Sequence, residues 1–145
     1  MVKYCLLLLC IVFIMPASLL SCAPAAGEAV TVSVTCDQFS KQKAITNDIG
    51  VLIGNKIKVN LCSNATTGFK WSEQAQIGDP QVLEQTGHEF IAPANGSKMV
   101  GVPGTEVWTF KALQPGKSTI YIEYSQPWQG GQKAAWTYKL NVIVK

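Results

Sequence analysis

The feature that most constrains this fold is a series of short segments in which apolar and polar residues alternate. Residues 30–35 alternate valine with threonine or serine, and residues 56–61 alternate lysine or asparagine with an aliphatic residue. Ile120, Ile122 and Tyr124 follow the same two-residue spacing. This period is typical of a half-buried β-strand, because successive side chains of a strand point to opposite faces of its sheet. The pattern therefore predicts sheets.

Further segments of this kind follow, and turn signals such as Gly-Asp-Pro at residues 78–80 and Gln-Pro-Gly-Lys at 114–117 separate them. We expect extended segments at residues 30–35, 49–53, 56–61, 69–76, 82–91, 105–113, 119–124 and 138–144. Residues 39–48 are polar without a sustained helical period, and we expect a loop or brief turn there. The sequence predicts an all-β, immunoglobulin-like β-sandwich of seven or eight strands.

A length of 145 residues allows one domain of ordinary size and an N-terminal segment. The formal charge is +3, all 12 basic residues are lysines, and they are spread along the chain. Nucleic-acid binding proteins instead carry basic stripes or clusters. We therefore expect no nucleic-acid partner, and we expect a monomer.

The N-terminus has the pattern of an export signal. Lys3 precedes an apolar run at residues 5–15, which is too short to span a bilayer. Leu19-Leu20-Ser21-Cys22 then resembles the lipobox of a prokaryotic lipoprotein, although a generic signal peptide could also end between Ala23 and Ala26. We expect a signal peptide at 1–21, a lipidated Cys22 with a tether at 22–28, and a domain at 29–145. The protein would be exported and lipid-anchored to the cell envelope.

The cysteines divide between these segments. Cys5 and Cys10 would leave with the signal peptide and Cys22 would carry the lipid, so that Cys36 and Cys62 remain in the domain. Two thiols in an exported domain favour a disulfide, and the alternative is a pair of buried free thiols. A bridge closing a loop of about 25 residues would stabilise the fold by roughly 3 kcal/mol on the chain-entropy model.

Between two expected strands, residues 63–71 read S-N-A-T-T-G-F-K-W. Small hydroxyl and amide side chains followed by glycine favour a stiff polar turn. This stretch resembles the first binding loop of the chagasin family of cysteine-peptidase inhibitors, whose pattern is N-P-T-T-G-[FY]. Asn64, Thr66, Thr67, Gly68 and Phe69 match the pattern. Ala65 stands where the family usually has proline.

Two later stretches continue the resemblance. Residues 101–104 read G-V-P-G, where the family has a glycine-rich loop, and Pro127 and Trp128 match the family's R-P-W, with Gln126 in place of arginine. The resemblance implies that three loops gather at one end of the sandwich and block the cleft of a papain-like cysteine peptidase, reversibly and tightly. The peptidase-binding residues would be Asn64, Thr66, Thr67, Gly68, Phe69, Gly101, Pro103, Gly104, Pro127 and Trp128.

The sequence offers little for catalysis. His88 is the only histidine, and a single histidine in a strand is more often a surface residue than a catalyst. No serine elbow, paired-carboxylate motif or metal-ligand spacing accompanies it. We expect no enzyme activity, no catalytic residue, no metal and no cofactor. The alternatives to an inhibitor are a surface carbohydrate-binding or adhesion lipoprotein, in which exposed aromatics such as Trp128 stack on sugars, and a structural envelope role.

Overall fold

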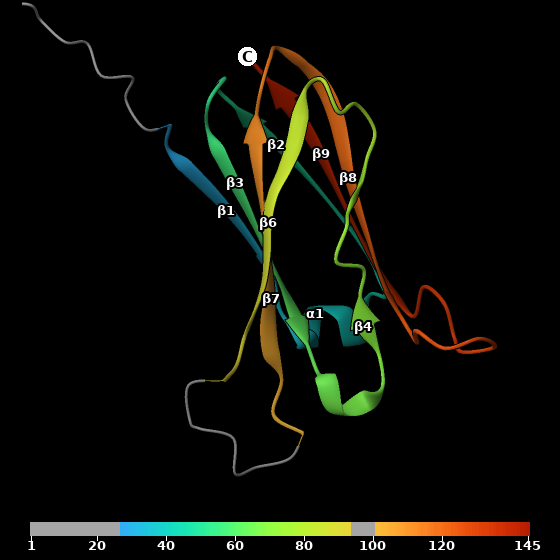
Figure 1. The fold of residues 1–145 in the computed structure, drawn as a ribbon. Coiled ribbons are helices and arrows are strands. Elements are labelled where there is room, and N and C mark those ends of the chain that lie inside the picture. The colour runs from blue at the N-terminus through green and yellow to red at the C-terminus, as the bar shows by residue number, and fades with distance from the viewer. Residues whose placement is uncertain (1–26, 94–100) are drawn as a thin grey trace, which may run out of the picture.

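The computed structural model describes residues 27–93 and 101–145 (Figure 1). The predicted signal peptide, lipobox and Cys22 lie outside these residues. The strands are β1 (Ala29–Val34), β2 (Ala44–Val51), β3 (Lys56–Ser63), β4 (Lys70–Trp71), β5 (Gln76–Ile77), β6 (Leu83–Ile91), β7 (Gly104–Ala112), β8 (Gly116–Ser125) and β9 (Trp136–Val144). A helix α1 (Cys36–Lys41) and a 3-10 helix η1 (Ala65–Thr67) complete the described part.

The strands form two sheets. The first has four strands in the order β1-β3-β7-β6, and the second has five, in the order β2-β9-β8-β4 with β5 also paired to β8. The inner pairs β3·β7 and β8·β9 are antiparallel, whereas β1 runs parallel to β3 and β2 runs parallel to β9. The predicted all-β sandwich is confirmed, with nine strands among the described residues instead of seven or eight.

The core lies between the sheets, where alternate strand residues point inward. Trp108 and Phe110 on β7 and Ile120, Ile122 and Tyr138 on the second sheet have no exposed surface. Burial of each such side chain stabilises the fold by about 1.5–3 kcal/mol. These residues occupy the inward positions that the two-residue period predicted. The faces of the sheets that are apolar in sequence are therefore the faces that are buried.

The prediction of a loop at residues 39–48 is wrong. Helix α1 begins after Thr35, whose side chain and that of Gln38 form a capping box, and it buries Phe39 completely. A helix of 6 residues is too short to show a helical period. Strand β2 follows. Its inward positions include Asn47 between Ile45 and Ile49, and because Asn47 is polar, the sequence does not show a regular apolar alternation there.

The expected strand at residues 69–76 is also interrupted. Only β4 and β5 pair with β8, and the chain between them bends away from a regular ladder. Here Ser72 N–H donates to Glu123 O at 2.9 Å, while Ala75 N–H donates to Gln85 Oε1 at 2.8 Å. The segment is thus bonded first to one sheet and then to the other, so it bridges the edges of both.

The two ends of the sandwich differ in what they carry (Figure 1). The loop pole holds the central loop (residues 63–69), the second loop (101–103) and the third loop (126–135). The terminal pole holds Gly27 with the turns at residues 52–55 and 112–116. No helix in the described ranges has the length and apolar character needed to span a membrane.

Candidate functional site at the loop pole

The central loop is held by its own side chains. Asn64 caps η1, because its Oδ1 accepts from Thr66 N–H at 3.2 Å and from Thr66 Oγ1 at 2.7 Å. Thr67 Oγ1 donates to Asn64 O at 2.7 Å. Gly68 then ends the turn with φ of +77°, in the left-handed region that favours glycine. The residues of the N-x-T-T-G pattern therefore build the loop's shape, and both threonines stay exposed.

Tyr124, on β8, supports this loop from below. Asn64 N–H donates to Tyr124 Oη at 3.2 Å, and Tyr124 Oη donates back to Asn64 O at 3.1 Å. The tyrosine ring stacks on Phe69 at 5.5 Å and on Trp136 at 4.8 Å between ring centroids. Because β3 leads into the loop from the first sheet and Tyr124 belongs to the second, the loop is fixed to both sheets.

The second loop is bonded directly to the central one. Asn64 Nδ2 donates to Gly101 O at 3.1 Å, and Gly101 has φ of +92°. Gly104 is the first residue of β7 rather than a loop residue, and the ring of Phe90 occupies the space where a Cβ would stand. The glycines of this stretch are thus explained by backbone conformation and close packing.

The third loop reaches the central loop from the other side. Trp128 is 50 % exposed, and its ring lies so close to Gly68 that a Cβ there would be 3.0 Å from Trp128 Cη2. Gln126, which stands in place of the family's arginine, closes this loop: its Oε1 accepts from Gln132 N–H at 2.8 Å, and its N–H donates to Gln132 O at 2.8 Å. Pro127 follows Gln126 in the chain and lies within the segment that the two bonds between Gln126 and Gln132 close. Trp128 is therefore partly packed against the central loop and partly exposed to solvent.

All three loops therefore meet around Asn64 and Gly68. Between them lies an apolar pocket of about 400 Å³. Its lining comprises Cys36, Asn64, Thr67, Phe69, Pro103, Tyr124, Ala135 and Trp136. Tyr124 and Trp136 were not recognised as site residues from the sequence. The signal for Tyr124 was its place as the last inward residue of an alternating strand that leads into the third loop.

A disulfide joins Cys36 to Cys62, with Cα atoms 5.2 Å apart. Cys36 is the first residue of α1, and Cys62 lies at the end of β3 just before the central loop. The bridge ties the start of the helix to the base of the loop. It thereby limits movement of the β3 end that carries Asn64.

A buried polar network lies beside the end of β3 that carries Cys62. Ser63 Oγ donates to Glu106 Oε1 at 2.7 Å, and His88 Nε2 lies 2.8 Å from Glu106 Oε2. The His88 ring packs on Trp108 at 4.8 Å between centroids, and only 20 % of its side chain is exposed. His88 is therefore a partly buried partner of Glu106 rather than a surface residue. Within the described ranges, no group of three or more potential ligands is placed to hold a metal ion.

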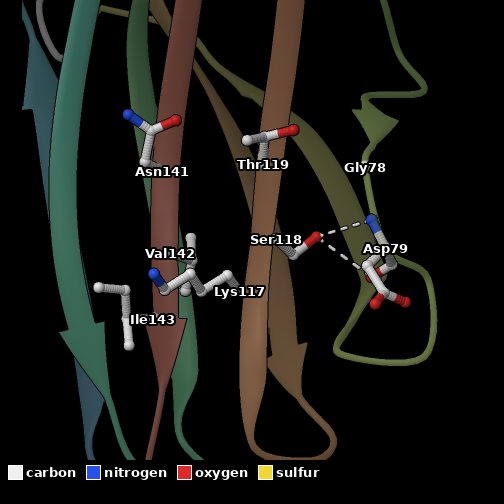
Figure 2. Close-up of a pocket in the computed structure, with 8 residues that line it drawn as sticks. All are labelled: Gly78, Asp79, Lys117, Ser118, Thr119, Asn141, Val142 and Ile143. Carbon is white, nitrogen blue, oxygen red and sulfur yellow. Dashed lines mark hydrogen bonds between the residues drawn. The ribbon is translucent and has the colours of Figure 1, made fainter.

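A second hollow lies on the flank of the second sheet (Figure 2). It measures about 370 Å³, and Ser118 and Asp79 line it together with β9 residues such as Asn141. Ser118 Oγ accepts from Asp79 N–H at 2.9 Å and donates to Asp79 O at 3.1 Å (Figure 2). Ser118 and the Asp79 backbone thus satisfy each other and do not point to a ligand. The loop pole is the better candidate site.

Comparison with known proteins supports this choice. Residues 51–142 match the chagasin family of peptidase inhibitors, I42, and this range contains the central, second and third loops. The chain belongs to the chagasin family. Its members are peptidase inhibitors rather than enzymes.

Two chagasin-family relatives show how far the likeness extends. Amoebiasin-2 from Entamoeba histolytica is 28% identical over 89 residues, which cover 61% of this chain and 70% of the relative. Chagasin from Trypanosoma cruzi is 27% identical over 82 residues, which cover 55% of this chain and 73% of chagasin.

Solved structures of the family share the fold. The cysteine protease inhibitor EhICP2 from Entamoeba histolytica has a TM-score of 0.60 and 22% identity, over 81% of this chain and 97% of that one. PbICP-C, solved in complex with falcipain-2, has a TM-score of 0.53 and 17% identity, over 82% of this chain and 98% of that one. The chagasin-like, immunoglobulin-like sandwich is thereby established.

Proposed function

We propose that this chain is a reversible, tight-binding inhibitor of papain-like cysteine peptidases that fills the active-site cleft with its three loops. The observation that carries the proposal is the position of Asn64, which caps the central loop and also bonds the second loop through Gly101. Trp128 adds the third loop through its contact with Gly68. The complex of PbICP-C with falcipain-2, a papain-like peptidase, supports this target class.

The threonine hydroxyls suit a cysteine-peptidase site. Thr66 Oγ1 donates its proton to Asn64 Oδ1, and Thr67 Oγ1 donates its proton to Asn64 O. Each exposed oxygen therefore keeps only acceptor capacity toward a partner. A catalytic cysteine thiolate is paired with a histidine imidazolium, which carries N–H donors. The central loop would present acceptors to that donor.

Inhibition would follow from obstruction. The loops are bonded to one another before binding, so little conformational entropy is lost when they dock. Protease–inhibitor interfaces bury about 1,600 Å² in total and are among the tightest known. Trp128, half-exposed at the edge of the central loop, is placed to anchor one wall of the cleft. One chain supplies all three loops, so the proposed inhibitor acts as a monomer.

We also propose that the protein is exported and held to the cell envelope by a lipid on Cys22. The support is the Leu19-Leu20-Ser21-Cys22 sequence and the Cys36–Cys62 disulfide, since disulfides persist in oxidising compartments. Mass spectrometry of the mature protein would test this directly, because a diacylated or triacylated Cys22 is expected at its N-terminus. An unmodified N-terminus between Ala23 and Ala26 would contradict it.

Titration of papain tests the inhibitory function. A soluble form that begins at Ala23 should inhibit stoichiometrically, and a Thr66→Ala, Thr67→Ala double variant should inhibit more weakly. Thr31→Ala is a matched control, because Thr31 is an exposed threonine on β1, outside the loop pole. Absence of inhibition by the parent form would favour a carbohydrate-binding lipoprotein instead, and equal inhibition by both loop forms would contradict the role of the threonines.

A further inference from the structure

The terminal pole carries an exposed apolar patch. Leu52 is 62 % exposed, Ile53 is 51 % exposed and Leu113 is 37 % exposed. The first two belong to the turn between β2 and β3, and the third belongs to the turn between β7 and β8. Hydrogen-bonded turns bring these exposed apolar side chains to one end of the sandwich, where together they form a surface suited to contact outside the domain.

Hydrogen bonds hold these turns together. Gly54 N–H donates to Ala112 O at 2.9 Å, and Ile53 N–H donates to Lys145 O at 3.2 Å. Gly27 packs against Gly54 so closely that a Cβ on Gly27 would collide with the Gly54 carbonyl. Gly27, the first residue that the structure describes, therefore lies beside the patch formed by Leu52, Ile53 and Leu113.

We propose that this patch rests on the lipid bilayer to which Cys22 is attached. The proposal depends on the lipid anchor proposed above, and it adds a defined orientation of the domain. Cys22 precedes Gly27 by five positions, and a fully extended chain covers about 3.5 Å per residue. Gly27 thus stays within about 18 Å of the anchored cysteine. So short a tether keeps the patch at a high local concentration of lipid.

The side chains around the patch carry a small excess of positive charge, four lysines against three acidic residues, which favours an anionic lipid surface. Four exposed lysines lie at the terminal pole, where Lys111 stands between Lys56 on β3 and Glu84 on β6. The pole's lysines are Lys56, Lys111, Lys117 and Lys145, and the acidic residues near them are Glu28, Asp79 and Glu84. Lysine stems lie along apolar surface while their ammonium groups reach headgroups. Exposed apolar side chains with lysines nearby can therefore rest at the boundary between headgroups and acyl chains.

The orientation has a consequence for inhibition. Strand β8 runs from the terminal pole to the third loop, and its 10 residues span about 33 Å at 3.3 Å per residue. With the patch on the bilayer, the three loops would stand about 30 Å from the lipid surface and face away from it. They would meet peptidases that arrive from solution.

Nitroxide-labelled lipid tests the orientation. The full chain, expressed with ¹⁵N in a bacterium that processes lipoproteins, would be purified and placed in vesicles of phosphatidylethanolamine and phosphatidylglycerol with a nitroxide on the headgroup. We expect the amide signals of residues 52–54 and 113 to broaden at least several-fold more than those of residues 66 and 128. Equal broadening at both poles, or none at either, would overturn the proposal.

Variants of the patch separate this proposal from the inhibitory function. Leu52→Ser, Ile53→Ser and Leu113→Ser together should abolish the asymmetric broadening, whereas methionine at the same three positions should preserve it. Papain inhibition should be unchanged in both variants. If the protein forms a dimer in detergent that the serine variant does not form, the patch binds a second copy of the chain rather than lipid. If residues 1–21 are retained and their signals show contact with the patch, the patch binds that segment. Either result would overturn the bilayer proposal. If the parent protein inhibits papain but its amide signals broaden equally at both poles, the bilayer orientation is overturned while the inhibitory function stands.

Discussion

The ring of Trp128 lies against Gly68, and a Cβ on Gly68 would come within 3.0 Å of Trp128 Cη2. Gly68 also has φ of +77°. Two independent constraints therefore demand glycine here: the left-handed backbone that ends η1 and the approach of an aromatic ring from the third loop. A single residue thus fixes both the shape of the central loop and its contact with the third.

Gly68→Ala should weaken papain inhibition by about 10-fold to 100-fold and lower the free energy of unfolding by about 1–2 kcal/mol, the cost of a left-handed non-glycine residue. The larger effect on inhibition is expected because the new Cβ displaces Trp128. Gly54→Ala is the matched control, since Gly54 has φ of +82° with no atom within 4 Å of an added Cβ. It should lose similar stability but keep inhibition. Equal inhibition by both variants would argue against the contact between the two loops.

Trp128→Ala should reduce inhibition more than it reduces stability. An aromatic side chain that anchors an interface contributes about 2–4 kcal/mol to binding, so its loss should weaken inhibition by about 30-fold to 1,000-fold. Trp128 is 50 % exposed in the free protein, so its removal should change the midpoint of thermal unfolding little. Inhibition kinetics and calorimetry would check the two halves of this prediction. A large loss of stability with unchanged inhibition would make Trp128 a structural residue.

Tyr124→Phe should loosen the central loop without emptying the core. The substitution removes the hydroxyl that bonds Asn64 N–H and Asn64 O, and an unpaired buried group costs about 1–3 kcal/mol. Hydrogen exchange of the amides at residues 64–68 should accelerate, and inhibition should weaken. Tyr121→Phe is the control, because that hydroxyl bonds only Glu123 beside it. If exchange in the loop is the same in both variants, Tyr124 does not support it.

Tyr138 makes the fold sensitive to alkali. Its side chain is fully buried, and its hydroxyl has no hydrogen-bond partner among the described residues. Desolvation by burial raises the Tyr138 pKa well above its ordinary value of 10.0. The folded state therefore holds this proton while the unfolded chain releases it. The free energy of unfolding should fall by up to about 1.4 kcal/mol per pH unit above pH 10 and be unaffected below it.

Tyr138→Phe should remove this dependence. Urea unfolding at pH 7, 10 and 11 should show a variant that is equally stable or slightly more stable at pH 7, because it loses an unpaired buried hydroxyl. The variant should then be clearly more stable than the parent at pH 11. The same alkaline loss in both proteins would place the titrating group elsewhere.

The strands with strict alternation were predictable from the sequence. Strands β7, β8 and β9 carry regular apolar positions such as Trp108, Ile122 and Leu140, and their burial follows the two-residue period. The first part of β2, residues 44–48, was missed because Asn47 takes an inward position and breaks that period. Helix α1 was missed because its support is a capping box and one buried ring, that of Phe39, rather than a repeated stripe.

Sequence resemblance located the loops, but it did not reveal what holds them. Asn64 and Gly68 were identified as pattern positions, whereas the structure shows that one caps η1 and the other admits Trp128. Tyr124 looked like an ordinary core residue, because a hydroxyl contact between residues 60 positions apart leaves no local signal. The partnership of His88 with Glu106 was hidden for the same reason, since it depends on the pairing of β6 with β7.

The parallel pairing of β2 with β9 affects when this protein can fold. Ala44 stands beside Thr137 and Val51 stands beside Val144, so the edge of the second sheet closes only after β9 has been synthesised, more than 90 residues after β2 begins. Contacts so distant in sequence form slowly. A nascent chain on the ribosome therefore cannot complete this edge of the second sheet until β9 has emerged, and β2 waits unpaired until then.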